Sequence, residues 1–301
     1  MTASAALIVF ISALTHAGLN LFGKKVSPSG AFFWHTTFWS AVLTLPLLIW
    51  LADLLPRLDR QIWQLVALTG LFQAMYLRAL AAAYRHGELS IVYPLARSSP
   101  LLILLTVALL LGRTEHVSGW LVLGLVLIVA GCIVLPMHAF RDFHLSNYGN
   151  LATLFSLLAA LSTAGYSLID DTAITLMRDL LAGVALDVET ALLFVMLQAW
   201  SALIWMTLSL FLQASERRLL LELACHWRST MVGGVLIIGT YGLVVWAMAY
   251  VEDVSYIVAF RQISIPMGVG LGWYFLGERM YAPKLVGVGA ILVGLMLLVL
   301  G

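Results

Sequence analysis

The stretch Ala13-Leu14-Thr15-His16-Ala17-Gly18 returns later in the chain as Ala160-Leu161-Ser162-Thr163-Ala164-Gly165, each time inside a long hydrophobic run. More pairs follow at nearly constant spacing, with Tyr76, Glu88, Ser90, Glu115, Gly124 and Gly131 matching Tyr241, Asp253, Ser255, Glu278, Gly287 and Gly294. Each half holds five such runs, and an odd number of membrane crossings per copy places the second copy upside down. The sequence therefore predicts two inverted five-helix repeats, the first over residues 1–140 and the second over residues 141–301.

The composition requires a membrane as solvent. Of the 301 residues, 62% are hydrophobic and 10% are charged, with a mean hydropathy of +1.01. In soluble domains about a quarter of the residues are charged. A crossing helix needs about 20 apolar residues, and ten runs are long enough: 3–22, 31–52, 62–84, 89–111, 118–136, 149–170, 189–212, 229–250, 255–276 and 283–301. We expect an all-α integral membrane protein with ten transmembrane helices and no removable signal peptide, because the first run belongs to the repeat.

The cysteines, the loop charges and the glycines indicate which cofactors, orientation and helix contacts to expect. The two cysteines, Cys132 and Cys225, have no metal-binding or redox spacing, so we expect no metal and no cofactor. The lipid bilayer is the expected surrounding, and nothing in the chain points to nucleic acid. Loop lysines and arginines are more numerous on the face opposite the termini, which predicts both termini outside. Glycine-spaced runs five and ten predict scaffold contacts or a homodimer surface.

Polar residues recur at every fourth position of the first run and include His16 and Asn20. This spacing places them on one helix face. One interpretation is a cavity wall in which His16 binds substrate or carries a proton. The alternative is hydrogen bonding between packed helices. The second repeat places Thr163 and Tyr166 at or beside the equivalent positions.

The fourth run contains Tyr93 and Arg97 on one face, with Pro94 and Pro100 close to the arginine. Proline removes a backbone donor and loosens a helix. Transporters expose backbone groups at such points, and a guanidinium there can hold a carboxylate or phosphate with two hydrogen bonds. The alternative is an arginine that extends to the membrane interface.

The ninth run repeats this arrangement, because Arg261 and Gln262 come shortly before Pro266. We therefore predict that the two arginines belong to one substrate site and that the three prolines act as hinges. Further cavity candidates are Gln73, Tyr76, Tyr241 and Trp246, for which the alternative is aromatic packing or anchoring at the interface.

The chain resembles the EamA-type transporters of the drug/metabolite transporter superfamily. The resemblance rests on Leu111-Gly112 with Glu115, on Leu276-Gly277-Glu278-Arg279, and on a glycine-spaced last helix in each half. The stretches His16-Ala17-Gly18-Leu19-Asn20 and Tyr93-Pro94-Leu95-Ala96-Arg97 are similar to a bacterial subgroup with His-Ala-x-x-Asn in helix 1. Leu19 departs from the tryptophan of that subgroup, which changes the shape of the cavity.

The resemblance implies a basket-shaped, multi-pass protein of the bacterial inner membrane with cytoplasmic termini, in conflict with the loop charges. It implies secondary-active export or exchange of a small metabolite, such as an amino acid, an organic anion or a drug, by alternating access. His16 as a titrating group predicts coupling to protons, and the alternative is uniport or exchange, which needs none. The alternative functions are a flippase for lipids or lipid-linked headgroups and an intramembrane enzyme. No zinc, nucleophile-elbow or P-loop motif supports the enzyme.

Overall fold

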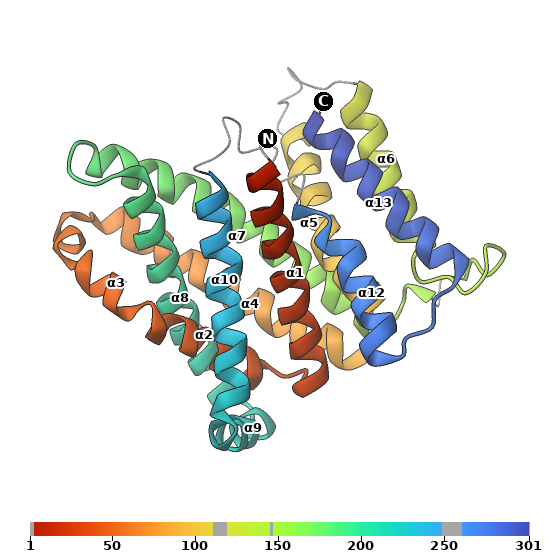
Figure 1. Cartoon of the computed structure of the whole chain (residues 1–301), viewed down its shortest axis with the longest axis horizontal. Coiled ribbons are helices and arrows are strands. Elements are labelled where there is room, and N and C mark those ends of the chain that lie inside the picture. Colours follow the sequence, from red (N-terminus) through yellow and green to blue (C-terminus); the bar gives the residue numbers. More distant parts are fainter. Residues whose placement is uncertain (1–2, 111–118, 145–146, 249–260, 301) are drawn as a thin grey trace.

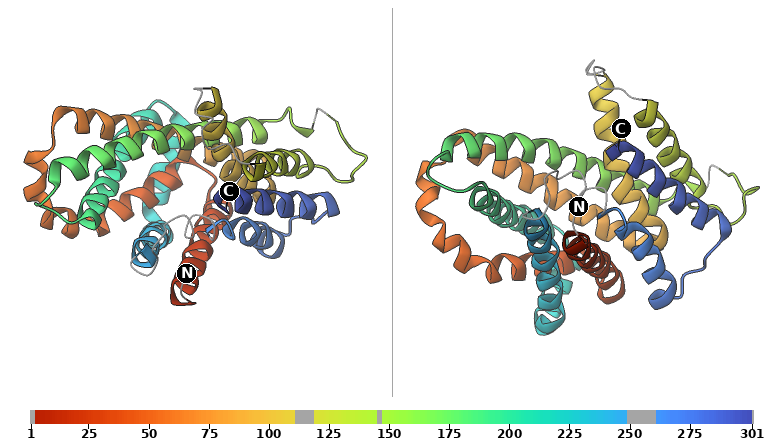
Figure 2. Two further views of the ribbon diagram at one scale, coloured as in Figure 1. Left: turned by 90° about the horizontal axis from the view of Figure 1, so that it is seen from above. Right: turned by 45° about the horizontal axis from the view of Figure 1, so that its top comes forward.

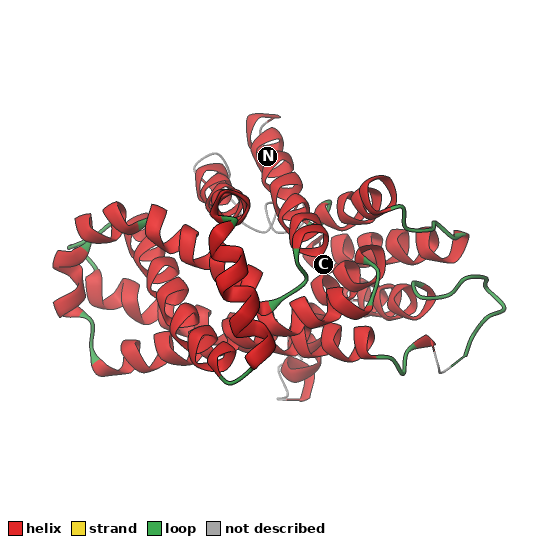
Figure 3. Cartoon of the chain, turned by 90° about the horizontal axis from the view of Figure 1, so that it is seen from below, coloured by secondary structure: helices red, strands yellow, loops and turns green. Residues whose placement is uncertain are grey.

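The computed structural model describes residues 3–110, 119–144, 147–248 and 261–300, and every regular element within these ranges is a helix (Figure 3). The first half contains α1 (Ala3–Val26), α2 (Gly30–Leu43), α3 (Leu45–Trp50), the 3-10 helix η1 (Ala52–Arg57), α4 (Arg60–His86), α5 (Leu89–Leu110) and α6 (Gly119–Val134). The second half contains α7 (Leu151–Leu181), α8 (Asp187–Phe211), α9 (Ala214–Cys225), α10 (Trp227–Met248), α12 (Ser264–Leu276) and α13 (Ala282–Leu300).

Each predicted run contains a helix, but three boundaries differ from the prediction. The run 31–52 is divided at Thr44, because Pro46 in the first turn of α3 cannot continue the hydrogen-bond ladder of α2. Helix α7 continues eleven residues past the predicted end at residue 170, since Ala173, Met177 and Leu181 pack into an apolar cluster with α4 and α8. The polar connection 213–228 forms α9.

Four helices are long and apolar enough to cross a membrane among the described residues, namely α1 from Ala6 onward, α4, α7 and α8. Helices α6 and α13 are shorter apolar helices. Figure 1 shows both chain ends on the upper side of the molecule. A chain that crosses the membrane an even number of times has both ends on the same side. The chain is thus an all-helical, multi-pass membrane protein, and the count of ten crossings stays a prediction.

Packing follows the pattern of a protein in lipid. In α7, Leu154, Leu161 and Leu168 are exposed, whereas Ala159 and Ala160 on the other face are fully buried. Lipid tails are as apolar as leucine, so a large apolar side chain gains no free energy by moving from the lipid to the protein interior. Small residues are found between helices because they let the backbones approach closely. This arrangement turns the small and polar residues of each helix toward the interior.

Many of the helix contacts follow the predicted repeat. Helix α4 packs on α7 and α8, and α10, its equivalent in the second half, packs on α1 and α2. In the same way the pair of α5 and α7 corresponds to the pair of α12 and α1. Helix α2 packs on α8, α5 on α12 and α6 on α13, and each of these three pairs joins equivalent helices. Exchanging the two predicted repeats preserves these contacts, whereas others, such as that between α2 and α9, have no counterpart of similar extent among the described residues, and the repeat itself stays a prediction.

Glycines join α6 and α13, which lie side by side in Figures 1 and 2. A Cβ on Gly131 would be 2.6 Å from the carbonyl oxygen of Gly287, and one on Gly294 would be 2.6 Å from that of Gly124. The glycine faces thus serve as a scaffold contact within one chain, as one of the two interpretations predicts. A homodimer stays a prediction.

Gly294→Ala is expected to destabilise the protein by about 1–3 kcal/mol, because the new methyl group meets backbone atoms that have no room to move. Gly289→Ala on the same helix is the matched control, since a Cβ there has nothing within 4 Å. Its expected effect is neutral or slightly stabilising. Denaturant unfolding of the purified protein measures both, and equal losses would contradict the close contact.

Candidate functional site

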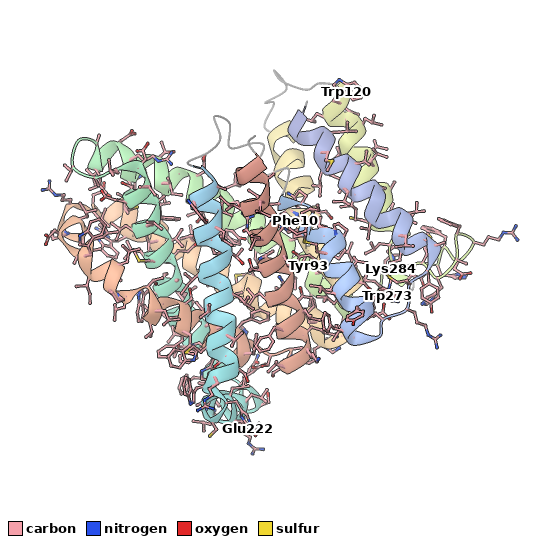
Figure 4. All side chains as sticks on the ribbon, viewed as in Figure 1. Phe10, Tyr93, Trp120, Glu222, Trp273 and Lys284 are labelled. Atoms are coloured by element: carbon pink, nitrogen blue, oxygen red, sulfur yellow. The ribbon has the colours of Figure 1, made fainter. Side chains whose placement is uncertain are left out.

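Seven charged and aromatic residues interact with one another, and we call them the central polar cluster: His16, Tyr76, Tyr93, Arg97, Tyr166, Tyr241 and Arg261. The first four come from the first half of the chain and the last three from the second. Tyr93 is buried, five of the others are partly buried, and Tyr241 is exposed. Tyr93 lies at mid-height between α1 and α12 in Figure 4. All seven are among the site residues that the sequence predicts.

The positive side chains of the cluster come from opposite halves. Arg97 of α5 and Arg261, which precedes α12, interact electrostatically with each other and with His16 of α1. The ring centroids of His16 and Tyr93 are 6.0 Å apart. The packing of α1 and α5 on α12 brings these groups together.

Tyrosines form the aromatic part of the cluster. The rings of Tyr76 on α4 and Tyr166 on α7 meet edge to face with centroids 6.0 Å apart. Tyr241 on α10 interacts with both and with Arg261. The ring contact of Tyr76 with Tyr166 is aromatic packing, and the cavity role of Tyr76 and Tyr241 stays a prediction.

Several polar atoms near the arginines are buried without a hydrogen-bond partner among the described residues. They are Tyr93 Oη, Arg97 Nε, Gln262 Oε1 and Ser264 Oγ. An unpaired buried donor or acceptor costs about 1–3 kcal/mol. All four atoms lie in two segments, residues 93–97 and 262–264, one in each half of the chain. Ser264 was not predicted from the sequence. Its only distinguishing feature there is its position close to Arg261 and Gln262.

The predicted hinge prolines lie in two different settings. Pro94 and Pro100 stand inside α5, which continues through both, and Ser98 donates a 2.8 Å hydrogen bond to the carbonyl oxygen of Pro94. Near Pro266 the backbone turns at Gln262 and Ile263 before α12 begins. The break that the sequence predicts beside an arginine is thus present next to Arg261, whereas α5 is continuous. The hinge role of all three stays a prediction.

The remaining predicted residues lie around the cluster. Asn20 accepts a 2.9 Å hydrogen bond from Tyr84 and donates one of 2.8 Å to the carbonyl oxygen of His16, so it links α1 to α4. Thr163 donates to the carbonyl oxygen of Ala159 at 2.9 Å. Gln73 is half-buried one turn before Tyr76, and Trp246 is exposed on α10. On the polar face of α1, Asn20 thus takes part in helix packing, and the role of His16 in binding substrate or carrying a proton stays a prediction.

A carboxylate network that sequence reasoning did not assemble lies next to the cluster. Asp170 of α7 interacts with Tyr166 and accepts hydrogen bonds from Thr69 of α4 and from Gln198 of α8, the latter at 3.0 Å to both carboxylate oxygens. From the sequence one can see only that Asp170 is an acidic residue at the end of an apolar run. Its partners come from other helices, and no spacing along the chain reveals them.

A second network closes the end of the protein at which α1 ends. The carboxylate of Glu278 accepts hydrogen bonds from the backbone N–H groups of Leu89 and Ser90, at 2.6 and 2.8 Å. Lys284 binds Glu88 at 2.6 Å and the Ser90 hydroxyl at 2.8 Å. Because carboxylates at a helix N-terminus are favourable, Glu278 from one half caps α5 of the other half.

A pocket of about 900 Å³ lies beside this network and includes Lys24, Glu88, Val92 and Glu278 in its lining. Along α1, Lys24 lines the pocket, Asn20 stands one turn deeper and His16 lies one turn deeper again in the cluster. The hydrogen bond between Asn20 and Tyr84 lies between the pocket and the cluster.

A separate pocket of about 640 Å³ lies between α4, α7 and α8. Its lining combines basic side chains, Arg78, Arg85 and His86, with apolar ones such as Leu158 and Leu208. The central polar cluster does not contribute to this lining.

Gly268→Ala is expected to displace Tyr93, because a Cβ there would be 2.5 Å from Cδ1 of the tyrosine ring. We expect about tenfold slower solute transport with the protein still folded, since small misplacements of site groups cost that much or more. Gly270→Ala on the same helix has nothing within 4 Å of the added Cβ and is the control. Equal transport by both variants would contradict a role for Tyr93.

Comparison with known proteins supports this picture of the fold. Residues 3–137 match the family model of the EamA-like transporter family. One solved structure, described only as the crystal structure of a protein, aligns with a TM-score of 0.55 at 20% identity and covers 99% of this chain and 96% of that one. This likeness shows the fold alone. No curated protein matches the sequence significantly.

Proposed function

We propose that this chain, an EamA-type transporter by the family match over residues 3–137, is a secondary-active transporter that exports or exchanges a small solute by alternating access. The observation that carries the proposal is the central polar cluster, which is drawn from both halves and contains unpaired buried polar atoms. We place the protein in the bacterial inner membrane, as the family resemblance implies.

The proposed architecture is two inverted repeats, residues 1–140 and 141–301, around the cluster. Its support is the set of helix contacts that exchanging the halves preserves, and the position of both termini on one side (Figure 1). In such folds two gates related by symmetry open in turn around one central site. The network of Glu278 and Lys284 with the start of α5 joins the two halves at one end, as a closed gate would.

Ser264→Cys, in a background of Cys132→Ala and Cys225→Ser, tests alternating access. Ser264 is buried next to Tyr93, and the substitution changes one atom. We expect an impermeant methanethiosulfonate to modify the introduced thiol in both right-side-out and inside-out vesicles. Ser12→Cys is the control and is expected to stay unmodified, because Ser12 is fully buried in the contact between α1 and α10. Modification from one face alone, or from neither, would contradict alternating access.

The second candidate function is a lipid flippase, which the basic and apolar pocket between α4, α7 and α8 favours. Its headgroup would bind Arg78 and Arg85 rather than the central polar cluster. A fluorescent-lipid flipping assay in proteoliposomes separates the two functions. Flipping that Arg78→Gln slows and Arg97→Gln leaves unchanged would favour the flippase.

A further inference from the structure

The charges of the central polar cluster are unbalanced. Among the described residues, the ion pairs join Arg85 to Glu216, Arg178 to Asp187 and Lys284 to Glu88, and none includes Arg97 or Arg261. The carboxylate that interacts with the cluster, that of Asp170, is already held by Thr69 and Gln198. Within the part of the chain that the structure describes, the two guanidinium groups therefore share a site without a paired carboxylate.

Two positive charges placed together in the interior are unfavourable in free energy unless a negatively charged group binds between them. Buried charges are ordinarily paired, and like charges in an interior repel more strongly than in water. Arg97 and Arg261, one from each half, are nevertheless near enough to interact electrostatically with each other and with His16. The cluster is thus arranged to receive a negative ligand.

The unpaired atoms specify the hydrogen bonds of that ligand. Arg97 Nε can donate to an oxygen, and the Tyr93 and Ser264 hydroxyls, which lie within reach of each other, leave at least one O–H group that can do the same. Tyr93 and Ser264 are 3% and 1% exposed, so bulk water does not satisfy them. Gln262 Oε1 is the one acceptor of the set, and it fits a hydroxyl or amino group on the ligand.

We propose that the transported solute is a small organic anion with two negative charges, whose carboxylate or phosphoryl oxygens bind Arg97 and Arg261 together with at least one of the Tyr93 and Ser264 hydroxyls. The inference rests on the proposed function and names its substrate class. Planar guanidinium groups bind both kinds of oxyanion with paired hydrogen bonds. Cations are excluded, because the two arginines repel them before they reach a binding position.

The charge of the site can be read without knowing the solute. In the Ser264→Cys vesicles, rates of modification are compared for an anionic reagent, 2-sulfonatoethyl methanethiosulfonate, and a cationic one, 2-(trimethylammonium)ethyl methanethiosulfonate. After division by their rates with a free thiol, we expect the anionic reagent to be at least about tenfold faster. Arg97→Gln and Arg261→Gln should each lower this ratio severalfold, whereas Arg178→Gln, on the outer part of α7, should leave it unchanged.

Protection by ligands then separates the two sources of oxyanion. Millimolar succinate and methylphosphonate are added as the carboxylate and the phosphonate probe, and succinamide is the neutral match of succinate. Slower modification with succinate alone identifies carboxylates, and slower modification with methylphosphonate alone identifies phosphoryl groups. Slower modification with both supports the shared chemistry.

A rate ratio of one or less would overturn the proposal, and so would protection by neither anion or equal protection by succinamide. These outcomes are distinct from a failure of the proposed function. If the Ser264→Cys thiol reacts from one face only, alternating access is wrong, but the charge preference of that reaction still reports on the anion site. If the thiol reacts from both faces without charge preference, the result supports alternating access and contradicts the proposal that the solute is an anion.

Discussion

Transport is expected to fall by about a hundredfold when Arg97 or Arg261 is replaced by glutamine. Each substitution removes a guanidinium from a site in which few other groups can replace its charge-assisted hydrogen bonds, which are worth about 1.5–3 kcal/mol each. The measurement is export from cells or vesicles after a screen across amino acids, organic anions, phosphonates and cationic drugs has found a transported solute. Lysine at either position should restore part of the rate, because it keeps the charge and loses the planar geometry.

Arg178→Gln serves as the control for these variants. Its side chain is half exposed, and its ion pair with Asp187, at 4.0 Å, is too long to contribute much. Membrane insertion and expression are measured for all three proteins. Undiminished transport by both Arg97→Gln and Arg261→Gln, with normal insertion, would remove the central polar cluster as the substrate site.

Glu278→Gln opens the end of the protein at which α1 ends. The carboxylate accepts two short hydrogen bonds from backbone N–H groups at the start of α5. A neutral amide oxygen accepts them more weakly, because charge-assisted bonds are about twice as strong as neutral ones. The closed state loses this energy while the open state does not. In the Ser264→Cys background, we expect modification of the thiol from this face to become about tenfold faster.

Glu222→Gln is the matched control, since Glu222 lies on α9 at the same end of the molecule (Figure 4) and is exposed. It should leave the rate unchanged. If Glu278→Gln accelerates modification from both faces equally, the network stabilises the whole fold and is not a gate. If it changes neither rate, the contact between Glu278 and α5 does not control access.

Much of the architecture was predictable from the chain. Hydrophobic runs of about 20 residues can only be helices in lipid, because each backbone group must find its partner within its own segment. The repeat of Ala13–Gly18 at residues 160–165 indicated which helices are equivalent, and the contacts between helices agree with that assignment. The arginines Arg97 and Arg261 were visible because a charged side chain is rare inside an apolar run.

Helix ends were less predictable. The extension of α7 to Leu181 and the formation of α9 depend on apolar side chains that pack against other helices. In the sequence these stretches contain as many polar residues as a loop. The prediction from hydropathy alone therefore ended α7 too early, at residue 170, and assigned residues 213–228 to a connection between helices.

The sequence by itself determined the membrane environment, the helical runs and the presence of arginine in two equivalent runs. Each of these is a property of one segment in its solvent. Only the tertiary structure decided that Asn20 belongs to packing with Tyr84, that Ser264 joins the site, and that Glu278 caps α5 from the other half. These facts depend on which atoms of distant segments come within hydrogen-bond distance, and helix packing alone sets those distances.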